Sequence, residues 1–141
     1  MKKVFSRGLS LFVILTLALI MCVSTAAAAP TPYASDFLNQ YDGVVSSEGD
    51  GTIKISFSVV GTGIISKIGV SKIVLEKQDG QYWIPVKTYN NTKNPELSTT
   101  NDYSYANYVL YDGEAGANYR AEITFFGNTD YRTIVTSPER A

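Results

Sequence analysis

Histidine is absent from the sequence, and the single cysteine, Cys22, lies close to the N-terminus. Imidazole and thiolate groups bind most protein zinc, and they activate the nucleophile in Ser–His–Asp and Cys–His enzymes. Beyond Cys22 the chain therefore has no residues for these catalytic or metal sites, and it has no pair of cysteines for a disulfide. We expect no cofactor, and a fold that is held together by packing alone.

Long apolar runs are also missing, with one exception between Leu9 and Val23. This run is about 15 residues long, whereas a helix needs about 20 residues to cross a bilayer. Three basic residues precede it and small residues follow it at positions 24–29, which is the pattern of a secretory signal peptide. We expect residues 1–28 to be cleaved, leaving a protein that is secreted or held at the cell wall and has no stable membrane anchor.

Basic charge is scarce once that peptide is removed. Three of the twelve Lys and Arg residues lie within it, and none of the thirteen Asp and Glu residues does. The exported chain is therefore acidic, without the basic surface that nucleic acid requires. We expect no nucleic-acid partner, a loosely ordered N-terminal segment at 29–40 with one helical turn at 36–40, and a single β domain at 41–141.

Alternating apolar and polar residues dominate this domain. Between Gly51 and Val60, every second side chain is apolar, which predicts a strand with one buried face. Gly61 to Gly63 should end that strand, and Asp79-Gly80 is typical of a hairpin turn. Pro85 predicts an edge strand or a bulge, because proline cannot donate to a ladder. The predicted strands cover residues 41–46, 51–60, 70–77, 81–89, 103–111, 119–126 and 131–137, with a surface loop at 90–101.

Seven short strands without a helical period favour a seven-strand antiparallel sandwich of immunoglobulin or fibronectin III type, with a small open barrel as the alternative. Tyr119 begins its strand after a glycine-containing corner, as the tyrosine-corner residue of such domains does. The segments 83–89 and 116–125 also resemble a family of small secreted proteins of Gram-positive bacteria, which remains essentially uncharacterised. The resemblance implies an Ig-like fold and a secreted location, and it implies no catalytic or ligand-binding residues.

Tyrosine is the most abundant aromatic residue, with ten copies. Exposed aromatic side chains stack on sugar rings or anchor protein partners, whereas buried ones only fill the core. The candidate ligand-binding residues on the predicted strands are Tyr82, Trp83, Tyr89 and Tyr108.

Carboxylates provide the remaining options for chemistry. Asp112 with Glu114, or Glu48 with Asp50, could form the acid pair of a glycosidase, and the loop at 46–51 has oxygen donors suitable for calcium. Solvent-exposed loop acids are the simpler interpretation of both.

The sequence therefore favours a non-catalytic binding or adhesion module that recognises a cell-wall polysaccharide or a surface protein. The alternatives are a self-associating structural unit of the cell envelope and a small hydrolase that uses carboxylates alone.

Overall fold

The computed structural model describes residues 35–141. The predicted signal peptide at 1–28 lies outside the described residues, as does most of the predicted N-terminal segment. Its last residues are extended, since the first strand begins at Leu38, and the predicted helical turn at 36–40 is wrong. Leu38 is buried and pairs with Gly61, so tertiary burial outweighs the local preference.

The prediction of an all-β antiparallel fold is confirmed, and the described residues form one seven-strand sheet. The strands are β1 (Leu38–Gly49), β2 (Thr52–Asp79), β3 (Tyr82–Asn90), β4 (Ser98–Asp112), β5 (Asn118–Gly127), β6 (Asp130–Val135) and β7 (Glu139–Arg140). A short 3-10 helix, η1 (Pro95–Leu97), precedes β4. The predicted loop at 90–101 is therefore shorter, the predicted last strand at 131–137 corresponds to β6 and ends two residues early, and β7 was not predicted.

Strand β2 organises the sheet. Its first half pairs with β1 and β4, the ladder to β4 continues as far as Gly69, and its second half pairs with β3 and β5. The predicted end of the strand at Gly61 to Gly63 is wrong, since the strand continues to Asp79, but its pairing is interrupted there: the ladder to β1 ends at Gly61, and the ladder to β4 shifts its register between Val60 and Ile65. Neither glycine has a positive φ, so the absence of side chains lets the strand bend without ending it.

The core lies between these two groups of strands. In the first half of β2 the predicted inward residues, from Ile53 to Val59 at every second position, are buried. In β5 the alternation that starts at Tyr119 and ends at Phe125 is buried in the same way. The alternation of apolar and polar residues in the sequence thus correctly predicted which face of each strand is buried.

Strand β3 confirms both predictions for Pro85. The strand pairs only with β2, so it forms an edge of the sheet. Its register also shifts, because Leu75 pairs with Lys87 while Glu76 pairs with Pro85. Val86 is the additional residue of this bulge, which lets the missing N–H of proline stay outside the ladder.

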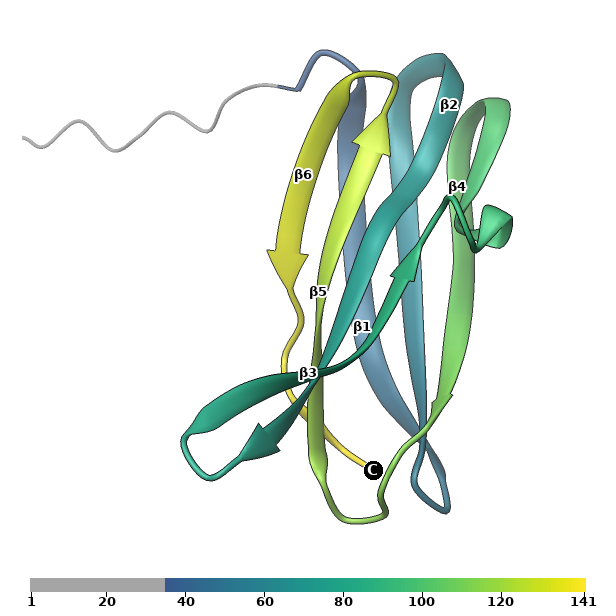
Figure 1. The fold of residues 1–141 in the computed structure, drawn as a ribbon. Helices are drawn as coiled ribbons and strands as arrows, with labels where there is room; N and C mark the ends of the chain where they lie inside the picture. Colours follow the sequence, from purple (N-terminus) through teal and green to yellow (C-terminus); the bar gives the residue numbers. More distant parts are fainter. Residues whose placement is uncertain (1–34) are drawn as a thin grey trace, which may run out of the picture. The chain divides into compact units, whose positions relative to one another are not determined.

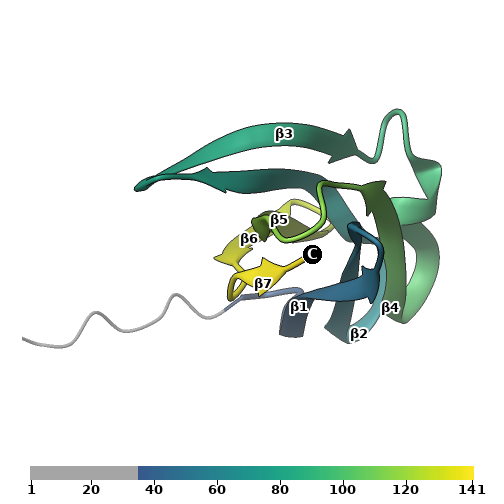
Figure 2. The same cartoon turned by 90° about the horizontal axis from the view of Figure 1, so that it is seen from below.

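The sheet curls strongly, as Figures 1 and 2 show. Strand β1 comes round to contact β6 and β7, but no ladder joins it to either strand. The hairpin formed by the end of β2 and the start of β3 projects from the opposite group of strands (Figure 1). Both features create surfaces that no other part of the described chain covers.

Candidate functional site

The four predicted aromatic residues do not come together. Tyr82 and Trp83 are adjacent in β3, so their side chains point to opposite faces of the hairpin. Tyr108 lies in β4 on the outer face of the other group of strands, where it pairs with Ser56. Tyr89 is only 9% exposed. Sequence alternation could separate neighbours in one strand, but it could not show which strands share a surface.

Tyr89 has a structural role. Its ring belongs to the buried core, and its hydroxyl donates a 2.9 Å hydrogen bond to the carbonyl oxygen of Leu110. Burial raises the pKa of the Tyr89 hydroxyl, so the group remains a neutral donor. The residue is thereby withdrawn from contact with a ligand at the surface.

Trp83 is half-buried, and a cation occupies one face of its ring. The guanidinium carbon of Arg120 lies 4.5 Å from the ring centroid. Arg120 also donates from Nε to Glu76 at 2.6 Å, which fixes the guanidinium over the indole. This cluster was not predicted, because it depends on β5 lying beside β2. The alternation in β5 indicated only that Arg120 points outward.

Tyr108 is half-exposed beside a second cation. The Lys54 ammonium lies 4.8 Å from its ring centroid and 3.4 Å from the carboxylate of Glu48. Lys54 therefore covers one face of the Tyr108 ring, which leaves at most the other face for a ligand.

The projecting hairpin carries the most exposed apolar side chains of β3. Tyr82 is 76% exposed, and Ile84 and Val86 are also exposed. Tyr82 and Ile84 share a face by alternation, and Val86 lines the same pocket as Ile84. We call these three residues the hairpin surface. Only Tyr82 of this set was predicted, because aliphatic residues in a strand normally indicate core.

A polar margin borders the hairpin surface. Lys77, which lines the pocket, forms an ion pair with Glu114, and the amide of Asn118 donates to Gln78 at 2.9 Å. The hydrogen bond to Glu114 raises the pKa of Lys77, and the same bond lowers the pKa of Glu114. The pocket therefore combines exposed apolar side chains with fixed amide and charged groups.

Comparisons with known proteins identify no family. No family model matches the chain, and no curated protein matches it. One solved structure with a partial resemblance is a family 76 glycoside hydrolase from a bovine Bacteroides thetaiotaomicron strain. The similarity has a TM-score of 0.34 and 15% identity, and it covers 72% of this chain. It spans 20% of the hydrolase chain.

Two of the four candidate carboxylates, Glu114 and Glu48, form ion pairs with lysine side chains. Glu114 is held ionised by Lys77, whereas a general acid needs a raised pKa. Glu48 is paired with Lys54, and Asp50 occupies a left-handed turn with φ of 51°. Within residues 35–141 no three acidic, histidine or cysteine side chains are grouped closely enough to hold a metal ion.

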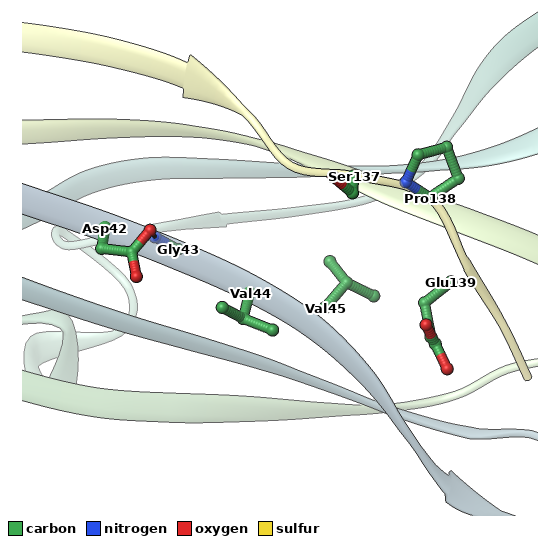
Figure 3. A pocket seen from close by; sticks show the side chains of 7 residues that line it. All are labelled: Asp42, Gly43, Val44, Val45, Ser137, Pro138 and Glu139. Atoms are coloured by element: carbon green, nitrogen blue, oxygen red, sulfur yellow. Dashed lines mark hydrogen bonds between the residues drawn. The ribbon is translucent and has the colours of Figure 1, made fainter.

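A second pocket lies between β1 and the segment that joins β6 to β7 (Figure 3). Its volume is about 370 Å³, and its lining residues are Asp42, Gly43, Val44, Val45, Ser137, Pro138 and Glu139. We call this pocket the β1 groove. It occupies the place where the curled sheet fails to close. No helix within the described range is long and apolar enough to cross a membrane.

Proposed function

We propose that the protein is a secreted, non-catalytic binding module that contacts a cell-wall glycan or a surface protein through the hairpin surface. The observation that carries the proposal is the exposure of Tyr82, Ile84 and Val86 on one face of a projecting hairpin. An apolar strip bordered by polar groups is the usual anatomy of an interaction site.

A surface protein is the preferred ligand. Two of the three side chains of the hairpin surface are aliphatic, whereas sugar binding depends on aromatic rings that stack on the pyranose. The other aromatic side chain of the hairpin, Trp83, is already covered on one face by Arg120. A glycan would have Tyr82 as its single free platform.

The proposed scaffold is a two-layer sandwich of immunoglobulin or fibronectin III type. In its favour, β1, the first half of β2 and β4 form one group of strands, and β3, the second half of β2, β5 and β6 form the other. Tyr119 also supports it, since this residue is 1% exposed and its hydroxyl accepts a 2.8 Å hydrogen bond from the N–H of Glu114. A tyrosine bonded to the backbone a few residues upstream is a feature of such sandwiches.

Secretion and membership of the uncharacterised Gram-positive family belong to the same proposal. The signal-peptide pattern of residues 1–28 supports the first, and the resemblance at 83–89 and 116–125 supports the second.

Co-sedimentation with purified Gram-positive cell walls tests the proposed function. We expect the protein to sediment with walls that retain their surface proteins, and less with walls stripped by protease. An Ile84→Ser, Val86→Ser double variant should lose most of this retention, because both substitutions remove apolar contact area.

Ile64→Ser is the matched control, because Ile64 is 81% exposed and lies outside the hairpin. Retention that survives protease but not wall hydrolase would assign a glycan as the ligand. No retention on any wall, or equal retention of the hairpin variant and the control, would remove the proposal.

A further inference from the structure

Three of the edge strands within residues 35–141, namely β3, β6 and β4, carry features that obstruct pairing with another chain. Strand β3 has Pro85 and its bulge. Strand β6 is short, and the guanidinium of Arg132 donates to Asp130 and to the carbonyl oxygen of Tyr131. Proline, bulges and charges are the devices that natural sheets use to protect their edges. The edges of β3 and β6 are therefore poorly suited to the self-association that was considered as an alternative function.

Strand β4 protects its edge with side chains. The Asn107 amide oxygen accepts a 2.9 Å hydrogen bond from the N–H of Tyr108, and the Tyr89 hydroxyl donates to the carbonyl oxygen of Leu110. Both backbone groups belong to even-numbered residues of β4. The even-numbered residues therefore face the free edge, and the odd-numbered ones bond to β2.

This alternation fixes the orientation of β1. Ser56 pairs with Tyr108 on one side and Val44 on the other, so its backbone groups bond toward β1. The odd-numbered residues of β1, which include Gly43, Val45 and Ser47, therefore direct their N–H and C=O groups to the free edge. The N–H of Gly43 agrees with this, since it is bonded to the Asp42 carboxylate at 2.9 Å.

No side chain in the described range bonds to the free backbone groups of Val45 or Ser47. Val45 lines the β1 groove together with Ser137 and Pro138 (Figure 3). The far wall is irregular between the end of β6 at Val135 and the start of β7 at Glu139, and Pro138 within it has no N–H. An added strand would thus find backbone partners on β1, and because β1 also contacts β6 and β7, the space beside it is that of the β1 groove, about 370 Å³.

The charges of the β1 groove define the ligand. Asp42 and Glu139 are both exposed at the groove, and neither forms an ion pair with a described residue. The remaining wall is apolar, with Val44, Val45 and Pro138. Successive side chains of an added strand would point inward to Val45 and outward to Asp42.

We propose that the β1 groove binds an extended, basic peptide segment of a partner protein by strand addition to β1. The segment alternates aliphatic residues, which face Val45 and Pro138, with lysine or arginine residues, which face Asp42 and Glu139. Its backbone bonds to Val45 and Ser47, as in other cases of β-augmentation. The groove shares no residue with the hairpin surface, so this site is additional to the proposed function.

Fluorescence polarisation with a labelled peptide of about nine alternating valine and lysine residues tests the proposal. We expect saturable binding of this peptide, and none of a valine–glutamate peptide. Two versions of the probe are N-methylated at alternate amides, offset by one residue. One should lose binding and the other should keep it, because only one set of amides faces β1.

Charge reversal locates the site. An Asp42→Lys, Glu139→Lys double variant should bind the valine–lysine peptide about tenfold more weakly, and it should gain affinity for the valine–glutamate peptide. Asp112→Lys is the matched control, because this exposed acid lies outside the groove. Hydrogen exchange at the Val45 and Ser47 amides should slow on binding, while Val44 and Ser46 already donate to β2.

Equal loss of affinity in both N-methylated probes, or unchanged binding by the double variant, would overturn strand addition at β1. Binding that disappears in the Ile84→Ser, Val86→Ser variant would instead assign the peptide to the hairpin surface. The two proposals therefore fail independently.

Discussion

Tyr119 shows how one side chain can fix a corner of the molecule. Its ring is buried, and its hydroxyl holds the N–H of Glu114 between β4 and β5. We expect Tyr119→Phe to lower the free energy of unfolding by roughly 1 to 2 kcal/mol, since it leaves that N–H without its acceptor. Urea denaturation measures the change.

Tyr108→Phe is the control for this substitution, because Tyr108 is half-exposed and its hydroxyl has no hydrogen bond with a described residue. It should change the free energy of unfolding by less than about 0.5 kcal/mol. Equal effects of the two substitutions would refute the role of the Tyr119 hydroxyl.

The Tyr89 hydroxyl makes the free energy of unfolding depend on pH in the alkaline range. Burial raises its pKa above the ordinary value of 10.0, so the unfolded chain releases this proton at lower pH than the folded chain does. The stabilisation is complete below pH 10 and is lost as pH rises through the folded pKa. In Tyr89→Phe, the free energy of unfolding should be lower throughout and should fall less steeply above pH 10. Urea titrations between pH 8 and 11 measure the slope, and an unchanged slope would contradict this account.

Gly69 controls the contact between β2 and the start of β4. It pairs with Ser98 and has a φ of 152°, and a Cβ atom there would overlap the backbone of Leu97 and Ser98. We expect Gly69→Ala to destabilise the protein by roughly 2 to 4 kcal/mol, because both neighbours are backbone and cannot move aside. Thermal unfolding measures the shift in Tm.

Gly63→Ala provides the comparison at another glycine of β2. A Cβ atom at Gly63 would have no heavy atom within 4 Å, and its φ is not positive. Its stability should stay within about 0.5 kcal/mol of the parent. A large loss at Gly63 would mean that the bend of β2 itself requires glycine.

At the scale of elements, the sequence predicted strands well and their ends poorly. Alternation identified the buried faces of β2 and β5, because burial on one side imposes a period of two. Alternation could not show what Gly61 and Gly63 do, because glycine can either end a strand or allow it to bend. The choice between these depends on Thr62, whose N–H donates to Phe37 at 3.0 Å from a distant part of the chain.

The candidate site was less predictable than the strands. Tyr82 was identified because exposed tyrosine is chemically distinctive, but Ile84 and Val86 resembled core residues. Their exposure follows from the projection of the hairpin beyond the sheet (Figure 1). The β1 groove was also not predicted, because it depends on which two strand edges fail to meet.

At the scale of the whole described domain, β2 should make unfolding cooperative. Both groups of strands depend on it, so neither group can unfold while the other keeps all its partners. We expect Trp83 fluorescence and far-UV circular dichroism to report the same urea midpoint.

Core truncations in the two halves of β2 test this coupling. Ile55→Ala lies in the first half and Leu75→Ala in the second, and both side chains are fully buried. Each should cost about 2 to 5 kcal/mol and lower the midpoints of both probes together. If Ile55→Ala moved the circular dichroism midpoint and left that of Trp83 in place, the two halves would unfold separately.

The long strand β2 also sets the order of events during synthesis. Three of its four neighbours, β3, β4 and β5, lie C-terminal to it, and Lys54 must wait for Leu110 to complete its pairing. At about 5 to 20 residues per second, the interval between the synthesis of Asp79 and that of Gly127 lasts a few seconds. During that time the isoleucines and valines of β2 have no covering layer from their own chain. The nascent protein therefore stays incompletely folded until β5 has been made, which keeps its apolar strands accessible to chaperones.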